Sequence, residues 1–200
     1  MTDIPLAKRL TRCPRARAPE DVSGELDRFD ADLRPLLAGA ASLAPYLATL
    51  MTKEADWLEE AVQAPEAALA GILAAPQTLE DADLNAGLRQ GKRRVALLSA
   101  LADLGGAWSL EEVTGALTRY ADAAAHAALR VSVGALIRRG KLPGLTPEDA
   151  QTGGGMTVLA MGKMGAGELN YSSDIDLICL FDEGRYDADD FQEVRAGLIK

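Results

Sequence analysis

Residues 158–180 read VLAMGKMGAGELNYSSDIDLICL, which combines an apolar run, a glycine-rich turn and two carboxylates. Asp174 and Asp176 stand two positions apart, and the apolar residues around them predict a strand. Because successive side chains of a strand point to opposite faces, both aspartates are expected on one face. Neighbouring carboxylates repel each other unless a hard divalent cation lies between them, and Mg²⁺ is usually held by one or two carboxylates together with substrate phosphates. The stretch therefore indicates phosphoryl chemistry.

The glycine turn does not fit two common phosphate-binding motifs. Three glycines follow a predicted strand, as in a dinucleotide-binding turn, but only six residues separate Gly167 from Asp174. A dinucleotide-binding turn instead opens a crossover helix of roughly ten residues or more. A P-loop is disfavoured because Met164 stands where Ser or Thr would hold Mg²⁺, and no glycine lies five residues before Gly162.

The spacing fits the nucleotidyltransferase pattern of the DNA polymerase β-like superfamily, in which Asp-x-Asp lies in an apolar strand shortly after a turn formed by an apolar residue and a glycine. Gly162 and Asp174 are twelve positions apart. In this pattern, backbone N–H groups of the turn cradle phosphates and the aspartates hold the metal ions that neutralise them. Asp174 and Asp176 are therefore the expected catalytic residues and metal ligands. The expected nucleotide or phosphate contacts are Gly162, Lys163, Gly165 and Ser173.

Two of these contacts have a structural alternative. Lys163 either meets a phosphate or faces solvent, and Ser173 either bonds a phosphate oxygen or caps the turn. Glu168 and Asn170 are expected to shape the loop by hydrogen bonding to its backbone.

Residues 161–178, MGKMGAGELNYSSDIDLI, closely resemble the motif of the bifunctional glutamine synthetase adenylyltransferase and deadenylylase family. Lys163 replaces the Gly or Ser usual in the superfamily but agrees with this family. The family has two such catalytic halves, and a motif that follows a leader of this length resembles the N-terminal, deadenylylating half. The resemblance implies phosphorolytic removal of AMP from a tyrosine of glutamine synthetase, giving ADP and regulating nitrogen assimilation.

The same resemblance implies a cofactor and partners. Mg²⁺ is the expected cofactor, and the expected partners are glutamine synthetase, ATP or ADP, phosphate and a PII signalling protein. Family members complete the metal site with a third carboxylate on a later strand, and none is legible before Lys200. We therefore expect the 200-residue chain alone to be inactive.

Two other functions remain open at this point. A PII-type uridylyltransferase has a similar Ser-Asp-Ile-Asp-Leu portion, although the wording of residues 168–171 favours the adenylyl family. A catalytically inactive binding or regulatory module is the second alternative, because the catalytic domain is incomplete.

Composition narrows the class of protein. The chain is 48% hydrophobic without an apolar run near the roughly 18 residues that a membrane span needs, which indicates a soluble protein. A net charge of −9 with 4% aromatic residues argues against nucleic-acid binding. Cys13 and Cys179 lie far apart and no secretory signal is present, so we expect a cytoplasmic protein without a disulfide.

The chain divides into four predicted segments. Residues 1–20 are basic and proline-interrupted and predict a flexible tail. Residues 21–140 have apolar residues at helical spacing and predict a helical domain. Residues 141–155 are rich in glycine and proline and predict a linker, and residues 156–200 predict an incomplete nucleotidyltransferase domain. The expected fold is α+β, with an N-terminal helical bundle followed by the start of a mixed β-sheet domain.

Local signals place several helix ends. Thr78 is predicted to cap a helix that ends at the glycine pair 105–106. Ser109 and Glu112 form a predicted capping box, which opens a long helix that ends at Gly140.

The C-terminal segment has its own predicted elements. Residues 156–161 and 175–181 are expected to form strands, and residues 162–173 a glycine turn with at most a short helical piece. A surface loop running into a helix is expected over residues 182–193.

Overall fold

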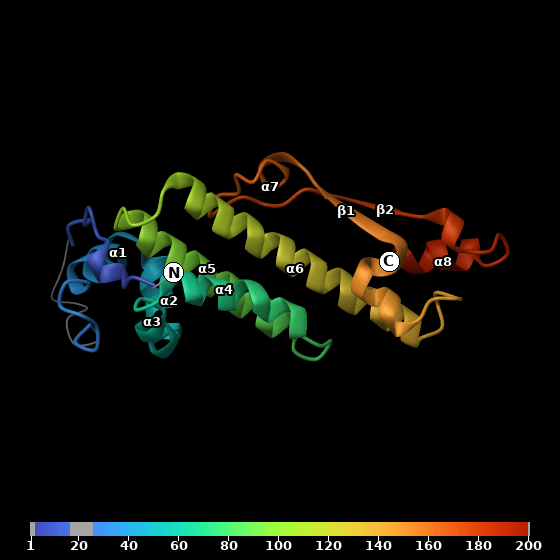
Figure 1. Ribbon diagram of the computed structural model, residues 1–200, viewed down its shortest axis with the longest axis horizontal. Coiled ribbons are helices and arrows are strands. Elements are labelled where there is room, and N and C mark those ends of the chain that lie inside the picture. The colour runs from blue at the N-terminus through green and yellow to red at the C-terminus, as the bar shows by residue number, and fades with distance from the viewer. Residues whose placement is uncertain (1–2, 17–25, 200) are drawn as a thin grey trace.

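The computed structural model describes residues 3–16 and 26–199, which form long helices and one small antiparallel sheet (Figure 1). The predicted α+β class is therefore confirmed. The helices are α1 (Arg34–Leu43), α2 (Pro45–Lys53), α3 (Ala55–Ala61), α4 (Pro65–Ala74), α5 (Leu84–Leu104), α6 (Leu110–Arg138), α7 (Gly162–Gly165) and α8 (Phe191–Leu198). The strands are β1 (Met156–Ala160) and β2 (Leu177–Phe181). Short 3₁₀ helices cover Leu6–Lys8, Ala75–Thr78, Pro147–Gly155 and Glu183–Arg185.

The α5–α6 hairpin forms the long axis of the molecule, α1 to α3 gather at one end of it, and α4 packs along α5 and α6 (Figure 1). The predicted capping box opens α6, since the Glu112 N–H donates to Ser109 Oγ at 3.2 Å and the Ser109 N–H donates to Glu112 Oε2 at 2.7 Å. The glycine pair ends α5 as predicted, and Gly106 adopts a φ of +67°. The predicted cap at Thr78 is wrong, because Thr78 ends a 3₁₀ turn and α5 begins only at Leu84.

Leucine is the most frequent residue in the core between these helices. Apolar residues repeat on one face of each helix, and their burial stabilises the fold by about 1.5–3 kcal/mol per large side chain. The fully buried members on α1, α3 and α5 are Leu36, Leu37, Leu58, Leu97, Leu98 and Leu101.

A buried carboxylate joins α2, α3 and α5. Glu54 is only 4% exposed and accepts from the Nε atoms of Arg93 and Arg94, each at 2.8 Å. The guanidinium of Arg94 also lies over the ring of Trp57 at 5.0 Å from its centre. A buried charge is tolerated only when it is paired and hydrogen-bonded, and two arginines meet that need here.

The N-terminal segment differs from the flexible tail that the sequence predicts for residues 1–20. Leu6 is completely buried, and two basic side chains form ion pairs, Lys8 with Asp32 and Arg12 with Asp103, both at 3.0 Å. Asp32 and Asp103, which belong to the helical unit of residues 26–140, thus pair with two of the basic residues, and burial of the Leu6 side chain holds the segment against that unit. Residues 1–2 and 17–25 lie outside the described residues.

The segment predicted as a linker also packs. Residues Pro147–Gly155 pack against α6 as 3₁₀ turns interrupted by a kink at residues 152–154, and Leu142 and Ala150 are buried in a small cluster with Val133 and Val194. This second cluster links α6 with α8.

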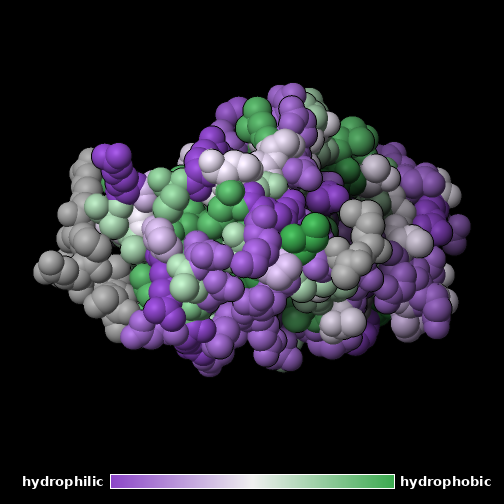
Figure 2. Space-filling view, turned by 60° about the vertical axis from the view of Figure 1, so that its left-hand side comes forward, coloured by the Kyte–Doolittle hydropathy of each residue, from purple (hydrophilic) through white to green (hydrophobic). Residues whose placement is uncertain are grey.

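The sheet pairs β1 with β2 antiparallel, with Met156 opposite Phe181 and Ala160 opposite Leu177. Large apolar side chains remain exposed on this unit, namely Leu159, Met161, Ile175, Leu177, Ile178 and Leu180. Figure 2 shows one face of the molecule, on which hydrophobic patches lie among hydrophilic residues. An exposed apolar group of this kind marks a surface suited to covering by further protein.

Candidate functional site

The structure brings the glycine turn next to the two aspartates. Beyond the Ala160–Leu177 pair, the Met161 N–H donates to the carbonyl oxygen of Asp176 at 2.9 Å. Asp176 therefore lies opposite the residue that precedes Gly162. The antiparallel pairing thus places the carboxylate segment at the same end of the sheet as the turn.

The prediction that the second strand begins at residue 175 is wrong. β2 starts at Leu177, and Asp174 and Asp176 precede it in irregular backbone. The reason lies in the partner strand, which ends at Ala160 before the chain turns at Gly162 with a φ of +56°. Strand alternation therefore does not govern the aspartate side chains, although both are exposed.

The backbone conformation explains why two positions of the turn are glycines. Gly162 and Gly167 adopt positive φ values of +56° and +77°, which side chains other than glycine rarely tolerate. Gly165 has none of this strain, but a Cβ there would lie 2.3 Å from the carbonyl oxygen of Ala160. Close packing of α7 on the end of β1 thus requires Gly165, whatever its contact with a phosphate. The first amides of α7 have no partner within that helix, and Lys163 is exposed beside them.

The loop after the turn is anchored in the helical core. Met164 and Leu169 are buried in the same cluster as the core residues of α5 and α6. The Leu169 N–H also donates to Thr118 Oγ1 on α6 at 3.2 Å. Leu169 gives a signal in sequence, as a lone apolar residue in a polar loop, whereas nothing near Thr118 indicates its part in the site.

Asn170 shapes the last turn before the aspartates, as predicted. Its Oδ1 accepts from the Ser172 N–H at 3.1 Å and from the Ser173 hydroxyl at 2.8 Å. The Ser173 hydroxyl is therefore engaged within the loop. The Tyr171 hydroxyl donates to Asp103 Oδ2 at 3.5 Å, and burial together with the charge of Asp103 raises the pKa of Tyr171.

The donor set of the site fits a hard divalent cation. Neither Asp174 nor Asp176 forms an ion pair with a Lys or Arg side chain of the described residues. Two unpaired carboxylates are suitable ligands for Mg²⁺, which keeps several waters and shares its shell with phosphates. Within residues 3–16 and 26–199, no group of three or more His, Cys, Asp or Glu side chains could hold a metal ion.

A cavity of about 720 Å³ adjoins Asp174, between α5, α6 and the segment that leads into β2. Its lining includes Ser173, Asp174 and apolar residues such as Leu117. It also includes Tyr120, whose hydroxyl donates to the Leu88 carbonyl at 2.6 Å. Burial raises the pKa of Tyr120 to about 12, so this phenol is neutral at pH 7. The volume is that of a small-molecule site, and one predicted metal ligand borders it.

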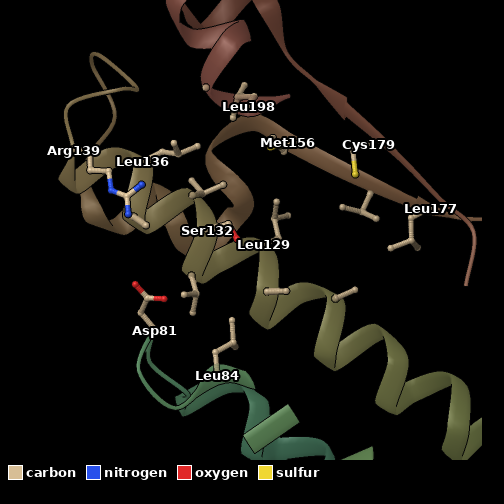
Figure 3. Close-up of a pocket in the computed structure, with 17 residues that line it drawn as sticks. Asp81, Leu84, Leu129, Ser132, Leu136, Arg139, Met156, Leu177, Cys179 and Leu198 are labelled. Atoms are coloured by element: carbon tan, nitrogen blue, oxygen red, sulfur yellow. The ribbon is translucent and has the colours of Figure 1, made fainter. Parts of the chain in front are cut away.

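A second cavity, of about 640 Å³, lies between α6 and the sheet and contains none of the predicted site residues. Figure 3 shows Leu129 and Leu136 from α6 on one side of it and Met156 and Leu177 from the strands on the other. Its mainly apolar lining makes it a gap in packing between the sheet and the helix.

Comparison with known proteins identifies the family. A profile of the glutamate-ammonia ligase adenylyltransferase family matches residues 31–197. The chain belongs to this family. The match spans the helices, the glycine turn and the aspartates, and so covers both the helical unit and the candidate site.

Individual relatives agree with the family assignment. A bifunctional glutamine synthetase adenylyltransferase/adenylyl-removing enzyme from Bradyrhizobium sp. (strain BTAi1 / ATCC BAA-1182) is 40% identical over an alignment 200 positions long. That alignment covers 88% of this chain and 20% of the relative. A protein of the same name from Caulobacter vibrioides is 40% identical over 166 residues, covering 80% of this chain and 16% of the relative. Both names specify adenylyl chemistry, which favours this family over the PII-type uridylyltransferases.

The chain spans about a fifth of the length of the curated relatives it matches. No solved structure shows a significant match. Among the described residues, no helix is both long and apolar enough to cross a membrane.

Proposed function

We propose that this chain carries the adenylyl-removing site of a bifunctional glutamine synthetase adenylyltransferase. The observation that carries the proposal is the pairing of Met161 with Asp176, which places the glycine turn beside two unpaired carboxylates. Membership of the family supplies the substrate class, since the relatives are named for adding and removing an adenylyl group. The resemblance of residues 161–178 and of the helical segment before them to the removing half supports this choice of half.

The proposed reaction is phosphorolysis of an adenylylated tyrosine. An oxygen of hydrogen phosphate attacks the phosphorus of AMP, the bond to the phenolic oxygen breaks, and ADP leaves. The proton of hydrogen phosphate passes to the tyrosine oxygen, so charge and atoms balance. Mg²⁺, when bound, supplies neutralisation of the phosphate charge. Asp174 and Asp176 would hold it, and the amides around Gly162 would orient the phosphates.

The proposal extends to partners and location. Glutamine synthetase is the proposed protein substrate, phosphate the second substrate, ADP the product and a PII signalling protein a regulator. A cytoplasmic location is part of the same proposal.

Substitution of the aspartates in the complete enzyme tests the function. Asp174→Asn or Asp176→Asn should lower ADP release from adenylylated glutamine synthetase by at least about a hundredfold, because several kcal/mol of charge stabilisation are lost. Addition of AMP should persist. Asp189→Asn, which removes an exposed carboxylate from the surface segment before α8, is the matched control. Loss of addition with removal intact would assign this chain to the adenylylating half instead.

A further inference from the structure

Thr118 connects the helical unit to the loop of the candidate site. It lies on α6 with only 6% of its surface exposed, and its Oγ1 is within hydrogen-bond distance of two groups. The distance to the Thr114 carbonyl oxygen is 2.8 Å, and the distance to the Leu169 nitrogen is 3.2 Å. A backbone N–H can only donate, so the Thr118 hydroxyl accepts a hydrogen bond from the Leu169 N–H and donates one to the Thr114 carbonyl oxygen. Both bonds can therefore form at once.

The Leu169 amide depends on this hydroxyl. Leu169 is 7% exposed, and its bond to Thr118 is buried. The loop has no strand or helix at this position that could supply another acceptor. A buried N–H without a partner is costly, so the loop is held in the observed register on α6 as long as the hydroxyl is present.

The fixed register reaches the aspartates through a short, internally bonded turn. Asn170 follows Leu169 directly, and its side chain binds the Ser172 amide and the Ser173 hydroxyl. Asp174 is the next residue. A displacement at Leu169 would therefore be passed along a stiff segment to the first carboxylate.

We propose that Thr118 is a positioning residue of the metal site, which holds Asp174 in place by accepting the Leu169 N–H. The proposal rests on the proposed function only in taking Asp174 and Asp176 as metal ligands. It gives α6 an indirect part in the chemistry, because the helix fixes the geometry of a metal ligand that lies outside it.

The chain offers a matched set of variants. Thr118→Val keeps the shape of the side chain and removes the acceptor, whereas Thr118→Ser keeps the hydroxyl. Thr114→Val makes the same chemical change one turn earlier on α6, where the hydroxyl donates to the Leu110 carbonyl at 3.0 Å instead of bonding the loop.

Metal affinity and backbone exchange in the complete enzyme are the first measurements, since neither needs turnover. We expect Thr118→Val to weaken binding of Mn²⁺ alone, followed by the loss of the free-ion spectrum, by roughly tenfold. Hydrogen exchange over residues 164–173 should accelerate by a similar factor. Thr118→Ser and Thr114→Val should match the wild type in both. Equal Mn²⁺ affinity in wild type and Thr118→Val would overturn the proposal, as would failure of Thr118→Ser to restore it.

Kinetics separate a positioning role from general destabilisation. If ADP release is observed, Thr118→Val should raise the Mg²⁺ concentration for half-maximal rate roughly tenfold and leave the rate at saturating Mg²⁺ nearly unchanged. A lower rate at every Mg²⁺ concentration, with half-saturation unchanged, would count against positioning. If no ADP is released, the proposed function fails, and the Mn²⁺ and exchange results still decide the role of Thr118.

Discussion

Replacing Gly165 by alanine sets two physical effects against each other. Gly165 ends α7 and has no positive φ, so helix propensity alone favours alanine by about 0.5–1 kcal/mol. The added Cβ, however, would lie 2.3 Å from the carbonyl oxygen of Ala160. Ordinary carbon–oxygen contacts of this kind are roughly 3.3–3.6 Å, so α7 and the end of β1 must separate by about 1 Å.

The steric effect should prevail. Overpacking of this size costs about 1–3 kcal/mol, and the atom to be displaced belongs to the backbone rather than to a flexible side chain. After the gain in propensity, we expect Gly165→Ala to destabilise the chain by up to about 2 kcal/mol. The movement falls at the turn that faces Asp176. Because a misplacement of about 1 Å can cost a hundredfold in rate, ADP release should fall by about that factor.

Urea unfolding of the chain and ADP release by the complete enzyme measure the two effects. Gly115→Ala is the matched control, because Gly115 lies within α6 and a Cβ there meets nothing within 4 Å. That variant should be more stable by about 0.5–1 kcal/mol with unchanged activity. The reasoning is refuted if Gly165→Ala behaves like Gly115→Ala.

Three further predictions concern the scaffold. Glu54→Gln should lower the free energy of unfolding by about 3 kcal/mol, the low end for a broken buried pair because Arg93 is 34% exposed, and urea unfolding that matches the wild type would contradict this. Ser109→Ala should cost about 1 kcal/mol, and Ser109→Asp should restore it, as followed by helix melting. Hydrogen bonds from Thr146 lower the pKa of Asp149 below 3.8. The stability that ionised Asp149 contributes to the fold is therefore present above pH 3.8 and is lost as the pH falls through the lowered pKa. Hydrogen exchange of the backbone amides of residues 147–155 should accelerate in that acid range, relative to the rate for an unfolded chain at the same pH. An equal acceleration in Asp149→Asn would exclude the Asp149 carboxylate as the cause.

The parts of the fold set by neighbouring residues could be predicted from the sequence. Ser109 and Glu112 lie three positions apart and cap a helix by themselves, whatever packs around them. The glycine turn and the apolar run of β1 are equally local. The candidate site was predictable to the same extent, because the motif concentrates its turn and its two carboxylates within residues 158–180.

The parts set by distant partners could not be predicted in this way. The start of β2 depends on where β1 ends, so Asp174 and Asp176 precede the strand instead of lying in it. The N-terminal segment is held by carboxylates such as Asp32 and Asp103, far along the chain. Composition describes the charge of that segment but not the partners that the fold presents to it.

The shared core of the helices and the glycine loop limits how members of this family can be recombined. Residues 141–155 have the glycine and proline content of a natural junction, and a chimera joined there would take Thr118 from one parent and Leu169 from another. The buried Leu169 N–H from one parent would then have to meet a suitable acceptor on α6 of the other parent, although the two sequences differ at more than half of their positions. Inheritance of the helical unit and the loop as one piece avoids that mismatch, so a workable crossover point lies outside the span from α6 to Asp174.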